Sequence, residues 1–191
     1  MSSVIVHNLD YNMTDEEFFH FCQQNPDMKF ERTASKQIIF MAPTTADTGN
    51  QNFNLSGEFY IWNRKEKLGY LFDSDSGFTL PNSAVRSPDI SWIEKEKWEE
   101  FSIEDKQSFT KVCPDFVLEL MSKSDSFNDT KNKMVEYIEN GAKLGWLVNP
   151  KERKTFIFKP ESETRAVSFD EILDGEEVLK GFTLQVSEII K

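Results

Sequence analysis

Hydrophobic and polar positions in the first third of the chain predict a helix, a strand pair and a longer helix. In residues 12–26 ("NMTDEEFFHFCQQNP") Thr14 and Glu17 have the spacing of a capping box, and Pro26 lies beyond the predicted end. Residues 28–43 ("MKFERTASKQIIFMAP") read as two short strands around a polar turn. Residues 45–72 then show apolar side chains at helical spacing, so a second helix is expected to end near residues 67–69.

From residue 70 the pattern changes to short apolar runs, typical of strands. Each run and its interpretation is as follows: a hairpin at 70–81 with Gly77 near its turn, a strand at 88–93, a charged helical or irregular excursion at 94–109, a strand at 116–121, a loop and helix at 122–141 ending at Gly141, a strand pair at 144–150 and 154–160, and a peripheral tail at 167–190 with one more short strand.

This order of elements predicts a mixed α/β (α+β) domain in which helices flank a central mixed sheet. No Gly/Ser linker or internal repeat divides the chain, so we expect a single domain over residues 1–191. Within it we expect an N-terminal helix and hairpin (13–43), a core (44–158) and a C-terminal tail (159–191).

Composition narrows the class of protein. The 191 residues are 38% hydrophobic and include 17 Phe, which is too apolar for a disordered chain. The formal net charge of −11 argues against a basic nucleic-acid-binding stripe, although a bound cation would reverse the sign of an acidic site. Cys22 and Cys113 are far apart and lack metal-type spacing, so reduced thiols are expected. Without a signal or membrane segment, the default expectation is a cytoplasmic protein.

Candidate chemistry begins with two Pro-Asp pairs, one ending at Asp89 and one at Asp115, and with Glu119 inside an apolar run. Asp115 and Glu119 on one strand would be ~13 Å apart at ~3.3 Å per residue. Two carboxylates on one hard cation must each approach it within about 2.6 Å, so this pair cannot share an ion. Asp89 and Glu119, on neighbouring strands, could lie with Cβ atoms about 5 Å apart and share Mg²⁺ or Mn²⁺.

Strand parity places Glu119 on a face that need not meet solvent. Phe116, Leu118 and Leu120 form one apolar face, and Glu119 lies on the other, beside Val117. A buried carboxylate needs a cation or a base as partner. The competing interpretation is a surface acid, or an acid paired with a nearby lysine.

Several segments resemble the Uma-type family of restriction-endonuclease-like proteins, which belongs to the PD-(D/E)xK nuclease superfamily. The resemblance runs from about residue 30 to 158. Its specific parts are "TADTGNQNFNL" (45–55), "FDSDSGFTLPNSAVRSPDISWI" (72–93), "PDFVLELMSKSDS" (114–126) and "KMVEYIENGAKLGWLVNP" (133–150).

The resemblance implies the restriction-endonuclease fold and divalent-metal hydrolysis of phosphodiester bonds in DNA. It implies Asp89 and Glu119 as the two metal-holding acids, with Mg²⁺ or Mn²⁺ as cofactor. The superfamily's lysine lies two residues after the second acid, where this chain has Met121. Methionine cannot orient a water molecule or neutralise a phosphate.

A basic group could come from the following helix instead. Lys133 borders the apolar face of that helix, and its spacing to Tyr137 matches the family pattern, so Lys133 is the preferred candidate over an ordinary lysine that flanks a helix. Lys131 is an additional candidate, and Lys123, in the loop after the strand, is the least constrained.

Three other positions in the matched region are weaker candidates for the site. Glu31 matches a recurrent acid of the family and could approach the metal, though a half-exposed strand acid is the simpler interpretation. Glu58 is interpreted as a surface acid. Asn52 stands where many relatives have His, and a cap or turn residue is expected there.

The matched region lacks the residues that other kinds of catalytic site would need. The two histidines, His7 and His20, lie outside the matched region, so a Ser-His-Asp or His-metal site is not expected. No glycine-rich phosphate loop is present. The tryptophans are expected in the core rather than as base-stacking platforms: Trp62, Trp92 and Trp146.

Two hypotheses follow. The first is a metal-dependent endonuclease with Asp89, Glu119 and Lys133 at its site, and DNA as its substrate. The second is a nuclease-fold protein that binds or scaffolds without cutting, which Met121 and the negative charge favour. It predicts a Glu119 that is neutral or paired with lysine. A homodimer is compatible with either hypothesis.

Overall fold

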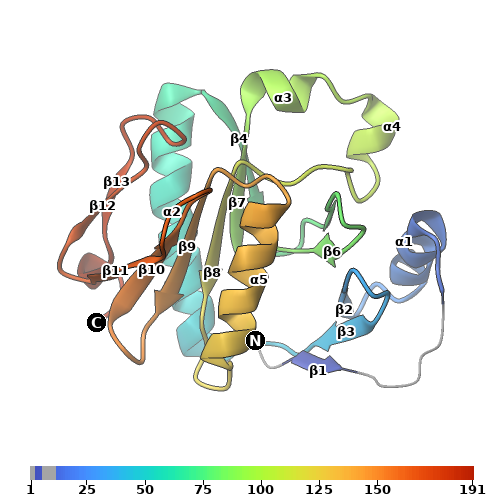
Figure 1. Cartoon of the computed structure of the whole chain (residues 1–191), viewed down its shortest axis with the longest axis horizontal. Helices are drawn as coiled ribbons and strands as arrows, with labels where there is room; N and C mark the ends of the chain where they lie inside the picture. The colour runs from blue at the N-terminus through green and yellow to red at the C-terminus, as the bar shows by residue number, and fades with distance from the viewer. Residues whose placement is uncertain (1–2, 6–11) are drawn as a thin grey trace.

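A six-stranded mixed sheet forms the centre of the protein in the computed structural model, which describes residues 3–5 and 12–191 (Figure 1). The strand order is β11-β10-β9-β8-β7-β4. The pair β8 and β9 is parallel and the other pairs are antiparallel. In chain order the strands are β4 (Gly69–Asp73), β7 (Ile90–Glu94), β8 (Phe116–Leu120), β9 (Leu144–Asn149), β10 (Lys154–Phe158) and β11 (Arg165–Ser168).

A second, five-stranded sheet lies beside the first, in the order β1-β3-β2-β6-β5, and a separate two-stranded pair, β12 and β13, lies near the C-terminus (Figure 1). The strands of these sheets are β1 (Ser3–Ile5), β2 (Lys29–Arg32), β3 (Ile38–Met41), β5 (Phe78–Thr79), β6 (Val85–Arg86), β12 (Ile172–Asp174) and β13 (Thr183–Gln185).

Two long helices cover opposite faces of the main sheet, α5 in front and α2 behind in the view of Figure 1. The helices are α1 (Asp15–Gln24), α2 (Ala46–Glu66), α3 (Lys95–Glu99), α4 (Ile103–Lys106), α5 (Phe127–Glu139) and a 3₁₀ turn, η1 (Val186–Glu188). Within the described residues, none of the helices has both the length and the apolar character to cross a membrane.

Strand β8 is buried along its whole length because both of its faces are covered. Phe116, Leu118 and Leu120 belong to the apolar cluster that includes the inner face of α2, and Val117 packs with the inner face of α5. The parity expected for this strand is confirmed, and it places Glu119 in the layer between β8 and α5.

Most of the predicted elements are present, since their signals are local. Thr14 and Glu17 form the capping box of α1, and α5 is followed by Asn140 and by Gly141 at φ 112°. The hairpin β2–β3, the excursion containing α3 and α4, and the pair β9–β10 also follow the prediction. The three predicted core tryptophans are buried: Trp62, Trp92 and Trp146.

The hairpin expected at residues 70–81 is wrong. A tight turn does occur, in which the backbone N–H of Ser76 donates to the carbonyl of Asp73. The chain then enters the second sheet, where β5 pairs with β6, whereas β4 pairs with β7. Phe78 still packs edge-on against Phe72, so the two segments stay in contact through side chains rather than through backbone bonds.

The peripheral tail with a single strand is also wrong. Residues after Phe158 contribute three strands, and β11 extends the main sheet by pairing with β10. The tail buries apolar side chains in the same cluster as α2 and β8: Val167, Phe169, Leu173, Leu179, Phe182, Leu184, Val186 and Ile190. The sequence did not reveal this burial because the apolar residues of the tail do not form one continuous run. They are separated by polar residues and by turns.

Candidate active site

Asp89 and Glu119 lie across the junction of two neighbouring strands, as predicted. Strands β7 and β8 are antiparallel, with Ile90 opposite Leu118, so the next step of the register brings Asp89 opposite Glu119. The backbone N–H of Leu120 donates to Asp89 Oδ2 at 2.8 Å. This bond fixes the Asp89 side chain beside the end of β8, next to the second acid.

Lys133 of α5, the preferred basic candidate from the sequence, contacts Glu119. Its Nζ lies 2.8 Å from Glu119 Oε1 and 2.8 Å from Glu31 Oε1. Met121, at the position of the expected lysine, is buried with Met134 in the apolar layer under α5. The structure therefore places an ammonium group beside Glu119 from the helix rather than from the strand.

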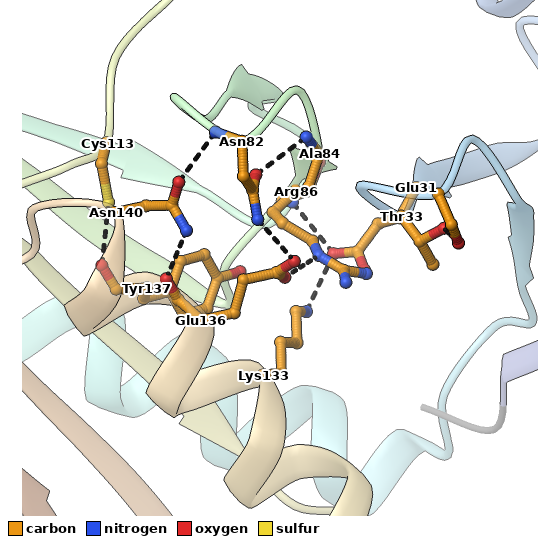
Figure 2. A network of polar contacts seen from close by, with 12 residues as sticks. Glu31, Thr33, Asn82, Ala84, Arg86, Cys113, Lys133, Glu136, Tyr137 and Asn140 are labelled. Atoms are coloured by element: carbon orange, nitrogen blue, oxygen red, sulfur yellow. Dashed lines mark hydrogen bonds and ion pairs between the residues drawn. The ribbon is translucent and has the colours of Figure 1, made fainter.

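Glu31 comes from β2 in the second sheet and is buried rather than half-exposed. Its Oε1 accepts from the backbone N–H of Ser87 at 3.0 Å, and its Oε2 accepts from Arg86 at 3.0 Å. Arg86 also donates through Nε to Glu136 of α5 at 2.7 Å. Figure 2 shows Arg86 and Lys133 both reaching Glu31, so that one carboxylate joins β2, β6 and α5.

Tyr137, one turn after Lys133, holds Glu119 from the same helix. Its hydroxyl donates to Glu119 Oε1 at 3.0 Å, the oxygen that Lys133 also contacts. The other oxygen, Oε2, receives no hydrogen bond from the residues that the structure describes. Glu119 thus has one oxygen held by α5 and one available to a ligand.

These groups line a cavity of about 490 Å³ between the two sheets and the N-terminal half of α5. The charged lining residues are Glu31, Arg86, Asp89, Glu119, Asp125, Asp129, Lys133 and Glu136. Acids outnumber bases in this lining, six to two. Ile39 and Met41 of β3 add an apolar wall.

Burial and neighbouring charge shift the pKa values of the acids in opposite directions. Burial, reinforced by the charges of Asp89 and Glu31 and only partly opposed by Lys133, raises the pKa of Glu119 to about 7. Burial also raises the pKa of Asp89, against the Leu120 hydrogen bond and Lys133. For Glu31, burial acts upward, but Lys133 and Arg86 outweigh it and the pKa lies below its usual range.

Lys133 remains protonated in this environment. Burial alone would lower its pKa, but the carboxylates of Glu119 and Glu31 raise it above the ordinary value. The ammonium is therefore a fixed positive charge and a hydrogen-bond donor, not a base.

The donor set at the β7–β8 junction suits a hard divalent cation. Carboxylate oxygens are the ligands that Mg²⁺ and Mn²⁺ prefer, and Mg²⁺ commonly takes only one or two carboxylates, with water or phosphate completing its shell. Asp89 and the second oxygen of Glu119 supply two. Among the described residues, no group of three His, Cys, Asp or Glu side chains is arranged to hold a metal. Glu31, the third acid nearby, pairs with Lys133 and Arg86.

The remaining candidates lie away from this junction. Lys131 is exposed on α5 and does not line the cavity, and Lys123 and Glu58 are also exposed. Asp115 is buried and accepts from the backbone of Glu94 and from lysines, in agreement with a structural role. Of the histidines, His20 is exposed on α1, and His7 lies outside the described residues.

Asn52 is the position near Asp89 that sequence reasoning misread. It lies inside α2 rather than at a cap or turn, and its Nδ2 donates to Asp89 Oδ1 at 3.2 Å. Arg86 was also missed. The only sequence signal for Asn52 was its place where relatives carry His, and Arg86 was visible only as part of the motif around Pro88.

Comparisons with known proteins agree with this fold. Residues 15–187 match the Uma2 family, described as "Putative restriction endonuclease". Among solved structures, the chain is similar to a crystal structure described as a putative nuclease belonging to DUF820 from Anabaena variabilis, with a TM-score of 0.76 and 17% sequence identity over 93% of this chain and 97% of that chain. No curated protein matches the chain.

Proposed function

Because the chain belongs to the Uma2 family of restriction-endonuclease-like proteins, we propose that it is a divalent-metal-dependent endonuclease that hydrolyses phosphodiester bonds in DNA. The observation that carries this proposal is the convergence of Asp89 and Glu119 across β7 and β8 with the Lys133 ammonium 2.8 Å from Glu119. Metal-dependent hydrolysis of a phosphodiester needs carboxylates to hold the ion and benefits from a positive charge beside the phosphate. Asp89 and Glu119 would meet the first need, and Lys133 would supply the charge.

Asp89 and Glu119 would hold the ion, Mg²⁺ or Mn²⁺, each already oriented by its neighbours. The Leu120 N–H and the Asn52 amide fix Asp89, and the Tyr137 hydroxyl fixes Glu119. When bound, the ion supplies a Lewis acid for a phosphoryl oxygen and lowers the pKa of a water molecule.

Lys133 would place positive charge beside the phosphate under attack and orient the water that attacks it. With Glu31 beside its ammonium group, Lys133 would stabilise developing negative charge rather than remove a proton. Glu31 would keep the ammonium in place when Glu119 turns toward the ion, because it contacts Lys133 through a separate bond and is itself held by Arg86.

A second candidate function, a nuclease-fold protein that binds without cutting, is favoured by one observation. Glu119 is paired with Lys133, which is one of the two states that this hypothesis predicts for it. The acidic lining of the cavity would also repel a phosphate backbone until a cation binds.

Nicking of supercoiled plasmid DNA and calorimetric titration with Mn²⁺ test the two functions together. Wild type should bind Mn²⁺ and cut DNA, and Asp89→Ala and Glu119→Ala should lose both properties. Lys133→Met should keep Mn²⁺ binding and lose cutting. Glu58→Ala, an exposed acid on α2, serves as the control and should behave as wild type.

Failure of wild type to bind Mn²⁺ would overturn the nuclease proposal and favour the second candidate. Binding of Mn²⁺ without cleavage of DNA or RNA would exclude the proposed activity while leaving the metal site in place.

A further inference from the structure

The outer face of α2 carries an apolar stripe that nothing in the described chain covers. Phe53 is 78% exposed, Tyr60 is 60% exposed and Ile61 is 65% exposed. They lie on one side of the helix, opposite the residues that pack into the core: Leu55, Phe59 and Trp62. Single exposed apolar side chains are common, but three large ones on one helix face mark an interaction surface.

Gly57 lies in the middle of this stripe. It is a helix-interior position, where glycine destabilises the helix relative to alanine. A Cβ atom added there would meet nothing within 4 Å, so the fold of one chain gives no packing reason for glycine. Close approach of a backbone from outside the chain would give one, because glycine permits such contact.

The stripe is complementary to itself when two copies of α2 pack antiparallel with Gly57 on the two-fold axis. Each Phe53 then faces Ile61 of the other copy, because the two positions are equally far from residue 57. A two-fold interface must pair residues in this reciprocal way. Helices packed with a shallow crossing of about 20° keep such contacts over several turns.

The charges at the ends of α2 obey the same symmetry. The first turn carries Asp47, and the last turn carries Arg64 and Lys65, followed by Lys67 at the C-cap. An antiparallel partner brings the first turn of one copy, with Asp47, near the last turn of the other, with Arg64 and Lys65. A parallel arrangement would instead place like charges together, which is unfavourable.

We propose that the Phe53–Gly57–Ile61 face of α2 is an isologous interface with a second copy of this chain, the two helices running antiparallel. Helices α5 and α2 lie on opposite faces of the main sheet (Figure 1), and the cavity that holds Asp89 and Glu119 is lined by residues of α5 and by none of α2. Pairing through the outer face of α2 therefore uses none of the residues that line the cavity, and the proposal does not depend on catalysis.

Sedimentation analysis of the full chain at tens of micromolar tests the interface. Wild type should sediment as a dimer, and Ile61→Arg as a monomer with unchanged circular dichroism and melting temperature. Ile103→Arg is the matched control, because Ile103 of α4 is 70% exposed but lies outside the stripe. It should remain dimeric. A monomeric wild type, or a dimeric Ile61→Arg, would overturn the proposal.

Disulfide cross-linking tests the orientation. Phe53→Cys and Ile61→Cys are made separately in a Cys22→Ser background, which removes the more accessible native thiol. Antiparallel helices predict that the mixture of the two variants cross-links upon mild oxidation and that neither does so alone. Cross-linking of Phe53→Cys to itself would show a parallel contact and contradict the arrangement.

Discussion

At the scale of single residues, Asn52 helps to fix the side chain of Asp89. Its amide donates to Asp89 Oδ1, while the Leu120 N–H holds Oδ2, so the carboxylate is fixed from both sides. Ser56, one turn further along α2, donates in turn to Asn52 Oδ1 at 3.3 Å. Groups that orient a metal-binding carboxylate in this way tune its affinity for the metal.

Asn52→Ala should weaken Mn²⁺ binding by about tenfold or more, because Asp89 loses one of its two orienting bonds. Calorimetric titration measures the change. Asn54→Ala is the control, since Asn54 is exposed on the same helix and bonds only within it. Equal Mn²⁺ affinities for Asn52→Ala and wild type would show that Asn52 does not orient Asp89.

The raised pKa of Glu119 makes folding stability depend on pH in the metal-free protein. Between pH 4.5 and about 7 the carboxyl ionises in the unfolded chain but keeps its proton in the folded one. The folded state then binds more protons, so the free energy of unfolding falls as pH rises through this window. The penalty is absent below pH 4.5.

Glu119→Gln cannot ionise and should escape this penalty. Its stability relative to wild type should therefore increase between pH 4.5 and 8, by up to roughly 3 kcal/mol. Urea unfolding in a chelating buffer measures the difference at each pH. A difference that stays constant across this range would mean that Glu119 titrates near its ordinary value.

At the scale of elements, α5 is joined to the second sheet through buried charge. Arg86 of β6 contacts Glu31 of β2 and Glu136 of α5, and Lys133 contacts Glu31 as well (Figure 2). Asn82, in the loop before β6, adds a bond to Glu136 at 3.0 Å. The helix that presents Lys133 is therefore positioned by the sheet that presents Glu31.

Arg86→Met removes the shared partner of two acids and leaves them under-compensated. Loss of one member of a buried ion network typically destabilises by about 3 kcal/mol or more. Chemical unfolding should show a loss of this size. The control is Arg165→Met, on the exposed part of β11, which should change stability by less than about 0.5 kcal/mol. Similar losses for both variants would contradict the role given to Arg86.

Sequence reasoning located elements more reliably than their partners. The capping box of α1 and the glycine after α5 are local signals, and both are confirmed. The pairing of β4 with β7 depends on a strand 21 positions along the chain, which no local pattern specifies. The same distinction applies to the site: Glu119 stood out as an acid in an apolar run, whereas Asn52 gains its meaning only from a contact across 37 positions.

At the scale of the whole molecule, the last residues of the chain are part of the core. The segment after Val167 buries seven apolar side chains against α2 and the main sheet, including Phe182, which lies 4.3 Å from Phe59 between ring centroids. Each such burial contributes about 2 kcal/mol, and the total stability of a domain is only about 5–15 kcal/mol.

Deletion of residues 169–191 should therefore prevent stable folding. Circular dichroism and thermal unfolding should show no cooperative transition in the shortened chain. Removal of Lys191 alone, which is exposed, is the control and should leave the transition unchanged. A cooperative transition after the longer deletion would show that the tail is dispensable.

The late position of the core residues 167–190 in the chain also has a consequence for biosynthesis. These residues are synthesised after Asp89, Glu119 and Lys133. The nascent polypeptide cannot assemble a finished hydrophobic core until residues 167–190 have also been made. The candidate site would therefore gain its full support from the core only after all of its own residues have been synthesised.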